Sequence, residues 1–375
     1  MKLTVSQSQF AHGLGVVARA VAPRSTLPVL NNILLATDEG RLRLSATNLE
    51  LGITFWIGAQ IQEEGSITVP ARTLTDLVTT LAGDKVELTL NPRNQSLNVH
   101  CGTSNFDIKG IDAQEFPPMP VAELSSGVEL NVADFKQIIQ QVSFAASTDE
   151  ARPVLQGVMM NIIGSEMTLA ATDGFRIAVK TASLSNPIAN PVKVIIPARS
   201  LSELARIATD GDERITMLVP SGRGQVIFHL KDAELVSQLI EGNFPDYNAI
   251  IPRSFKTRAV IATAELLKAC KQGEIIAREG NNVIRLKIQA GGNEPGVVNL
   301  TSISEETGKG EVVVEAAIDG PELLIAFNVH YISEVLEVIG TPSTVLETNA
   351  NNTPGLITPV GDQSYKHVIM PMHLG

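Results

Sequence analysis

Val69-Pro70-Ala71-Arg72-Thr73-Leu74 is a short stretch that returns twice further along the chain. It returns as Ile196-Pro197-Ala198-Arg199-Ser200-Leu201 and, more diverged, as Phe327-Asn328-Val329-His330-Tyr331-Ile332. In each copy, apolar residues recur at i, i+3, i+4 and i+7, which predicts an amphipathic helix with one buried stripe. The three stripes are Leu74/Leu77/Val78/Leu81, Leu201/Leu204/Ala205/Ala208 and Ile332/Val335/Leu336/Ile339. A spacing of roughly 130 residues fits three repeated domains better than solenoid units.

Other landmarks repeat with the same offset. Leu27-Pro28-Val29-Leu30 matches Arg152-Pro153-Val154-Leu155, and Leu44-Ser45-Ala46-Thr47-Asn48 matches Leu169-Ala170-Ala171-Thr172-Asp173. Glu115-Phe116-Pro117 matches Asn243-Phe244-Pro245. A further helix begins each repeat, marked by Phe10/Leu14/Val17, Phe135/Ile139/Val142 and Leu266/Cys270. Each repeat therefore reads helix, strands, helix, strands, which predicts an α+β fold with domains at residues 1–124, 128–252 and 254–375.

Composition restricts the class of protein. The chain has 375 residues, enough for two or three domains, and a formal net charge of −11. This acidity argues against charge-driven binding over the whole surface, although a local basic lining can coexist with it. Cys101 and Cys270 are the two cysteines, and the start of the chain carries no long apolar run. We therefore expect a reducing cytosol, no signal peptide and no membrane span.

Catalytic motifs are missing from the sequence. There is no P-loop, no His-Glu-x-x-His and no Cys-x-x-Cys, so we expect no catalytic residues, no metal site and no cofactor. Gly13-Leu14-Gly15-Val16-Val17-Ala18 fits the dinucleotide fingerprint formally. A true fingerprint follows a strand, whereas this one lies inside a predicted helix. Each glycine should weaken that helix by roughly 1 kcal/mol, and the sequence gives no physical reason for either.

The predicted helices carry basic and amide side chains. In residues 133–146 the buried stripe is Phe135, Ile138, Ile139 and Val142, and the opposite face carries Lys136, Gln137, Gln140 and Gln141. Lys268 and Lys271 lie on the first helix of the third repeat, and Arg72, Arg199 and Arg206 on second helices. This pattern fits a solvated surface or a shared surface for a polyanion equally well. The sixth helix departs from it with Glu334 and Glu337.

The end of the chain is apolar. A final strand explains Val368 and Ile369, but Met370-Pro371-Met372 lies beyond it. Proline stops a strand ladder, and methionine suits adaptable binding surfaces. The segment is therefore hard to explain as core alone.

In this order, on three repeats, the features resemble the β subunits of bacterial DNA polymerase III, the family of replicative sliding clamps. The most specific stretches are Leu27-Pro28-Val29-Leu30, Ala171-Thr172-Asp173-Gly174-Phe175-Arg176, Phe244-Pro245-Asp246-Tyr247, Phe327-Asn328-Val329-His330-Tyr331 and Met370-Pro371-Met372. The resemblance implies three repeated DNA-clamp domains, with helices lining a ring and antiparallel sheets outside. It implies a head-to-tail homodimer, joined through Phe106 and Ile108 against Ile275 and Ile276.

By the same resemblance, the ring would encircle duplex DNA without sequence preference and tether the replicative polymerase, with no catalysis, cofactor or membrane. The expected location is the cytoplasm, at the nucleoid. A loose grip suits sliding, because many phosphate contacts would make binding steeply salt-dependent. We expect a basic lining formed by Arg24, Arg72, Lys136, Arg199, Arg206, Lys268 and Lys271.

The resemblance further implies that polymerase, clamp loader and repair proteins dock by short linear peptides. The implied cleft consists of Leu155, Thr172, Gly174, Phe175, Arg176, Ile177, Pro245, Ile250, Val368, Ile369, Met370, Pro371 and Met372. Phe175 stands where relatives often carry histidine, and the chain ends in His373-Leu374-Gly375 rather than at an arginine-leucine pair. These departures leave the peptide preference open.

Two other readings compete. A peptide-binding scaffold without DNA encirclement would suit the acidic balance and the acidic sixth helix. An enzyme with its site in a crevice between domains would need a cluster of nucleophile, base and oxyanion donors, which the sequence does not offer.

Overall fold

The computed structural model describes residues 1–22, 25–120, 127–209, 214–279, 281–292 and 294–373. In these residues the strands form two antiparallel sheets of twelve strands each. The chain divides into two compact units, residues 1–135 with 203–239 and residues 136–202 with 240–375. The first sheet lies in the first unit and the second sheet in the second unit, so each unit contains part of the middle repeat.

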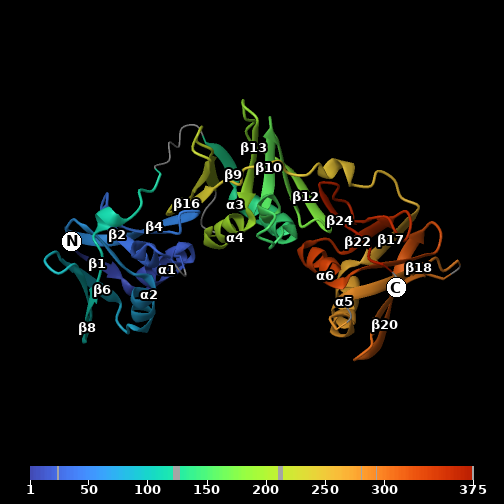
Figure 1. Cartoon of the computed structure of the whole chain (residues 1–375), viewed down its shortest axis with the longest axis horizontal. Helices are drawn as coiled ribbons and strands as arrows, with labels where there is room; N and C mark the ends of the chain where they lie inside the picture. The colour runs from blue at the N-terminus through green and yellow to red at the C-terminus, as the bar shows by residue number, and fades with distance from the viewer. Residues whose placement is uncertain (23–24, 121–126, 210–213, 280, 293, 374–375) are drawn as a thin grey trace. The chain divides into compact units, whose positions relative to one another are not determined.

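The three repeats share one order of elements: a strand, a helix, four strands, a second helix and three strands. Figure 1 shows the two helices of each repeat near each other, as α1 and α2, α3 and α4, and α5 and α6. The first repeat comprises β1 (Lys2–Ser6), α1 (Gln7–Val17), β2 (Asn32–Asp38), β3 (Arg41–Thr47), β4 (Leu51–Glu63), β5 (Ser66–Pro70), α2 (Ala71–Thr80), β6 (Lys85–Asn91), β7 (Ser96–Cys101) and β8 (Ser104–Lys109). The second comprises β9 (Val128–Asn131), α3 (Val132–Val142), β10 (Gly157–Ile163), β11 (Glu166–Thr172), β12 (Arg176–Ser183), β13 (Val192–Pro197), α4 (Ala198–Ile207), β14 (Arg214–Leu218), β15 (Gln225–His229) and β16 (Ala233–Gln238). The third comprises β17 (Thr257–Ala262), α5 (Thr263–Ala277), β18 (Val283–Gln289), β19 (Gly296–Ser304), β20 (Gly308–Asp319), β21 (Leu323–Asn328), α6 (Val329–Val338), β22 (Ser343–Thr348), β23 (Gly355–Pro359) and β24 (Tyr365–Ile369). The predicted α+β repeat is therefore confirmed.

The second helix of each repeat begins inside the repeated stretch. Strands β5 and β13 end at Pro70 and Pro197, and α2 and α4 start at the next residue. Before α6, Asn328 caps the helix by accepting a hydrogen bond from the backbone N–H of His330 at 3.0 Å. The predicted stripes face the core, although Leu77 and Ala205 are only half-buried. The repeated stretch is thus a strand-to-helix corner.

The first helix of the first repeat shows why one of its two glycines is needed, and the first helix of the second repeat buries a side chain that the sequence placed on the surface. A Cβ on Gly13 would lie 2.7 Å from Leu44 Cδ1, so α1 needs glycine to approach the sheet closely. Gly15 has open space around it, and nothing in the structure explains it. Helix α3 ends at Val142, and a 3-10 helix follows at Ser143–Ala145. The prediction that Gln141 lies on the exposed face is wrong, because Gln141 is only 3% exposed.

Successive repeats are joined edge to edge by antiparallel strands. In the first unit, β16 pairs with the first half of β4, so that Leu235 lies opposite Ile53. In the second unit, β24 pairs with the first half of β12, and His367 lies opposite Ala178. Among the described residues, β8 pairs only with β7, and residues 308–315 of β20 pair only with β19. One edge of the first repeat and one of the third thus stay open.

Candidate functional site

The turn between β11 and β12 is built by two side chains. Thr172 Oγ1 donates to the Arg176 carbonyl at 2.6 Å and accepts from the Gly174 N–H at 3.1 Å. Asp173 Oδ1 accepts from the N–H groups of Phe175 and Arg176 at 2.9 and 3.0 Å. Gly174 has a φ of +95°, which favours glycine. The result is a tight turn that carries Phe175 at its tip.

The C-terminal segment is bound to this turn. The N–H of Met370 donates to the carbonyl of Phe175 at 2.8 Å, and the N–H of Met372 donates to the carbonyl of Ala326 at 2.8 Å. Phe175 is 59% exposed and Met370 is 39% exposed. Two large apolar side chains thus reach solvent from backbone segments that are hydrogen-bonded to each other.

The other predicted cleft residues surround this pair at different depths. Ile177 lies opposite Val368 in the β12–β24 ladder, and both belong to a buried cluster against which Phe244 and Tyr247 pack. Gly174, Pro245 and Ile250 are exposed, Leu155, Pro371 and Met372 are half-buried, and Thr172, Arg176, Ile177, Val368 and Ile369 are buried. The Leu155 turn approaches Gly174 through Arg152, whose Nη1 donates to the Asp173 carbonyl at 3.2 Å. The predicted set thus combines an exposed apolar rim with a buried floor.

Arg176 differs from the others because its guanidinium group is enclosed. The residue is 7% exposed, and its Nε donates to Asp173 Oδ2 at 3.1 Å. Its Nη1 pairs with the carboxylate of Glu334 on α6, and its Nη2 donates to the carbonyl of Phe144 at 2.9 Å. The group also lies over the Tyr331 ring, 4.3 Å from its centre. Sequence reasoning missed these partners, because it treated Glu334 only as a departure from the basic pattern.

A buried histidine lies near this network. His367 is fully buried and stacks on Phe144 with 5.5 Å between ring centres. Its two ring nitrogens have no hydrogen-bond partner among the described residues. Burial, reinforced by the positive charge of Arg176, lowers the pKa of His367 to about 3. The imidazole is therefore neutral over the physiological pH range.

This histidine should make the chain sensitive to acid. Since the folded state resists protonation of His367, the unfolded state binds the proton first, and stability falls as the pH drops from about 6.5 towards 3. Between pH 7 and pH 5 this one group should cost about 2 kcal/mol. Leu235 occupies the position of His367 at the junction of the first two repeats. His367→Leu should therefore remove this contribution to the pH dependence of the unfolding free energy, measured by denaturant unfolding at several pH values. If the variant shows the same pH dependence of stability as the parent chain, the low pKa of His367 is not its cause.

The predicted basic residues are mostly exposed, and several are ion-paired. Arg24 lies outside the described residues. Arg72, Arg199, Arg206, Lys268 and Lys271 are exposed, and Lys136 is half-buried. Arg72 lies 3.6 Å from Asp76, Arg206 lies 2.9 Å from Glu203, and Lys271 lies 2.9 Å from Glu337. Carboxylates on the same helices or their neighbours thus partly neutralise this basic set.

The four residues predicted at the subunit joint lie on open edges or near them. Phe106 on β8 is 44% exposed, and Ile275 on α5 is 58% exposed. Ile276 is half-buried. Ile108 is already buried within the single chain, at 8% exposure, so it offers less surface to a partner than its sequence position suggests.

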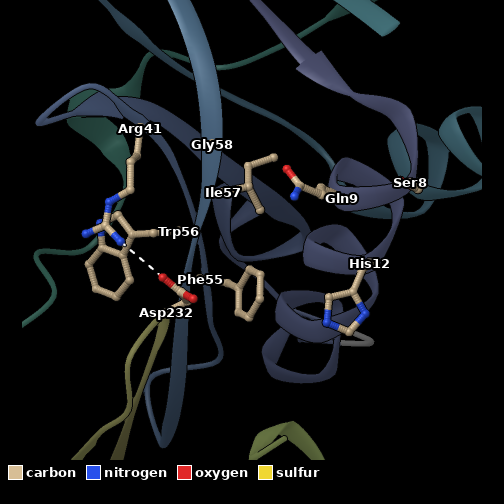
Figure 2. Close-up of a pocket in the computed structure, with 9 residues that line it drawn as sticks. All are labelled: Ser8, Gln9, His12, Arg41, Phe55, Trp56, Ile57, Gly58 and Asp232. Carbon is tan, nitrogen blue, oxygen red and sulfur yellow. Dashed lines mark hydrogen bonds and ion pairs between the residues drawn. The ribbon is translucent and has the colours of Figure 1, made fainter. Parts of the chain in front are cut away.

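The first unit contains a cavity of about 340 Å³ (Figure 2), which bears on the hypothesis that the chain is an enzyme. It is lined by Ser8, His12 and Asp232, the residue types of a catalytic triad. Asp232 instead pairs with Arg41 at 3.3 Å, as Figure 2 shows, and Ser8 Oγ lies 3.0 Å from Ser6 Oγ. Within the described part of the chain, no hydrogen bond joins the three. The cavity therefore lacks the geometry of an activated nucleophile.

The described residues also lack two further features. No group of three or more His, Cys, Asp or Glu side chains in them could hold a metal ion. No helix among them is long and apolar enough to cross a membrane.

Comparisons with known proteins agree along the whole chain. Models of the N-terminal, central and C-terminal domains of the DNA polymerase III beta subunit match residues 1–120, 129–246 and 248–373. The beta sliding clamp of Synechococcus elongatus is 34% identical, with all of both chains covered, and that of Staphylococcus epidermidis is 33% identical, with 99% of each covered.

Solved structures give the same answer. The sliding clamp of Bacillus subtilis is 29% identical, with a TM-score of 0.93 over 100% of both chains. A Pseudomonas aeruginosa sliding clamp bound to griselimycin is 28% identical, with a TM-score of 0.91 over 100% of both chains. The chain therefore belongs to the DNA polymerase III β-subunit family, the sliding clamps, which are non-catalytic processivity factors of DNA replication.

Proposed function

We propose that two copies of this chain close head to tail into a ring around duplex DNA and tether the replicative polymerase to it. One observation carries this proposal. The same strand junction joins the first repeat to the second and the second to the third, and it leaves β8 of the first repeat and the first part of β20 of the third repeat without a partner strand. A repeated heterologous contact closes into a ring when its rotation allows. The same junction between two copies would supply the missing joints.

The register of the internal junctions predicts which residues meet at the third. Leu235 lies opposite Ile53 at the first junction, and His367 lies opposite Ala178 at the second. The equivalent position on β8 is Phe106, because these three residues occupy the same place in their hairpins. The hairpin pairs are Phe106 with Val99, Leu235 with Phe228 and His367 with Ile357.

The residue of β20 that would lie opposite Phe106 follows from the same comparison of the repeats. Ile53 lies six residues before Ala59, which pairs with Val5. In the third repeat Ala316 pairs with Ile261 in the same way, so Gly310 is the equivalent of Ile53. A Cβ on Gly310 would lie 2.9 Å from Ser302 Oγ and 3.5 Å from Ile276 Cγ1, so this face of the strand is turned towards Ile276. Phe106 of one copy would therefore cover Gly310 and Ile276 of the other.

The neighbouring pair adds charge complementarity. Because the strands are antiparallel, Asp107 of one copy would lie opposite Lys309 of the other. Both residues are exposed in the single chain. An exposed pair of this kind contributes little affinity, but it helps to fix the register.

We propose that the domains are residues 1–124, 128–252 and 254–375. The leading strands of the second and third repeats support these limits, because β9 starts at Val128 and β17 starts at Thr257. The proposed location is the cytoplasm, at the nucleoid, where duplex DNA is the sequence-independent partner.

The DNA-facing residues would form a loose lining. The proposed set is Arg24, Arg72, Lys136, Arg199, Arg206, Lys268 and Lys271. A formal charge of −11 and the ion pairs of Arg72, Arg206 and Lys271 support weak contact rather than tight binding. Weak contact suits a ring that must slide, since every fixed phosphate contact adds salt dependence and resistance to movement.

Polymerase, clamp loader and repair proteins would dock by short linear peptides in the cleft around Phe175 and Met370. The exposed apolar rim over a buried floor supports this role. Two or three apolar anchors, at about 1.5–3 kcal/mol each and less the cost of ordering the peptide, give roughly micromolar affinity. Affinity of that order allows partners to exchange.

Loading on circular DNA tests the ring. The chain is incubated with nicked circular DNA, the matching clamp loader and ATP, washed in high salt, and the circle is then cut once. We expect retention on the circle and release from the linear form, because salt breaks charge contacts but leaves a closed ring. If a known clamp loads in parallel and this chain never stays on the circle, the scaffold without encirclement becomes the better reading.

A further inference from the structure

We propose that Arg176 acts as a positioning residue, whose ion pair with Glu334 holds the Thr172–Phe175 turn and the C-terminal segment for peptide binding. This inference rests on the peptide cleft proposed above. It assigns a role in peptide affinity to Glu334 on α6, which is outside the predicted cleft.

Each of the three guanidinium nitrogens of Arg176 has a polar partner. Its nitrogens contact the Asp173 carboxylate, the Glu334 carboxylate and the Phe144 carbonyl. Its plane lies over the rings of Tyr331 and Phe144, at 4.3 and 5.2 Å from their centres. A planar cation with five donors is suited to such a multiple contact. Because Arg176 is only 7% exposed, little of the group is open to a carboxylate of a bound peptide.

The contacts run from α6 to both sides of the cleft rim. Glu334 holds Arg176, and Arg176 holds the Oδ2 atom of Asp173. The Oδ1 atom of Asp173 accepts the N–H of Phe175, and the carbonyl of Phe175 accepts the N–H of Met370. Movement of α6 at Glu334 would therefore shift Phe175 and Met370 together.

The first repeat contains the same turn without the arginine. Thr47 Oγ1 donates to the Leu51 carbonyl at 3.1 Å, and Asn48 Oδ1 accepts from the N–H groups of Glu50 and Leu51 at 3.0 and 2.7 Å. Leu51 takes the place of Arg176 and is 3% exposed. The turn thus forms without a guanidinium group, and an apolar side chain can fill the position. What Arg176 adds is the connection to α6, at the junction where the C-terminal segment docks.

A matched pair of variants on α6 tests the proposal. Glu334→Gln and Glu337→Gln each remove one negative charge from the same helix, but Glu337 pairs with Lys271, away from Arg176. We expect Glu334→Gln to weaken the binding of a polymerase-derived peptide about tenfold, since directly coupled, partly buried pairs show interaction energies of this order. Glu337→Gln should change the affinity less than twofold. Equal effects of the two variants would overturn the proposal.

A double-mutant cycle separates positioning from direct recognition. If Arg176 acts through Glu334, Arg176→Leu combined with Glu334→Gln should bind no more weakly than Arg176→Leu alone. The loss should also be the same for peptides with and without an acidic residue. If Arg176 contacts the peptide itself, Glu334→Gln should leave binding unchanged, and the Arg176→Leu loss should grow for acidic peptides. Tyr331→Leu, which removes the ring under the guanidinium group, gives a second route should Glu334→Gln fold poorly.

Hydrogen exchange of the free chain tests the same contacts without a peptide. The amides of Phe175 and Met370 should exchange faster in Glu334→Gln than in Glu337→Gln, because their acceptors depend on the Arg176 network. If peptides fail to bind the unaltered chain, the cleft assignment fails, while this exchange difference still decides whether Arg176 holds the turn. Unchanged exchange would show that the network is not needed for it.

Discussion

A chain that ends at Ile369 should bind partner peptides at least about a hundredfold more weakly than the full chain, while the proposed dimer persists. Deleting residues 370–375 removes Met370, an exposed apolar side chain of the rim, together with the half-buried Pro371 and Met372. Loss of two apolar anchors at about 1.5–3 kcal/mol each corresponds to this fall in affinity. Ile369, the last residue of β24, stays in the chain and keeps its pairing with Arg176.

The measurement is fluorescence polarisation with a labelled peptide from the matching polymerase, beside sedimentation of the unlabelled chain. Met370→Leu is the matched control, because it keeps the apolar volume and should stay within a few-fold of the parent. Unchanged affinity after the deletion would remove the cleft assignment. Loss of the dimer together with peptide binding would instead show that the segment is needed for the fold.

Helix positions were the most predictable part of this fold. A stripe such as Ile332/Val335/Leu336 is a local pattern, and its 3.6-residue period survives any tertiary arrangement. The repeated corner at Pro70 and Pro197 is equally local, since it joins a strand to the helix that follows directly. Repetition then gave the α+β architecture, because each copy independently supported the same order of elements.

Side chains whose partners lie far away in sequence were not predictable. Gln141 reads as part of a polar helix face, yet it is buried, and its backbone carbonyl accepts the Tyr365 hydroxyl from 224 residues away. Glu334 reads as an unfavourable acid on a DNA-facing helix, yet it is paired with Arg176. Periodicity places a residue on a face of its own helix, but it cannot say which other element covers that face.

The joints between repeats were missed for the same reason. Nothing in the residues of β16 or β24 indicates that each completes the sheet of the preceding repeat, since strand pairing depends on residues far apart along the chain. The resemblance supplied Phe106 and Ile108 as joint residues, but Ile108, which lies opposite Leu97 on β7, is already buried within the single chain. The register of the third joint could be inferred only after the two internal joints were known.

A chain carrying Asp107→Cys and Lys309→Cys should form a covalent dimer almost completely under mild oxidation. The inferred register places these residues directly opposite each other, and opposed Cβ atoms in antiparallel strands lie about 4.5–5.5 Å apart, close to disulfide reach. Cys101 and Cys270 are buried, so the parent chain should not cross-link. Asp107→Cys with Glu311→Cys, two residues out of register, is the matched control and should cross-link poorly.

The same cysteine pair tests encirclement most severely when it is oxidised after loading on a nicked circle. Both joints of a ring would then be covalent, and a protein threaded by DNA should stay with the circle even in denaturant. One cut in the DNA should release all of it, because nothing but topology would hold the two together. A covalent dimer that leaves the intact circle in denaturant would mean that the ring closed beside the DNA. A higher yield from the 107–311 pair would mean that the joint uses a different register from the two junctions inside the chain.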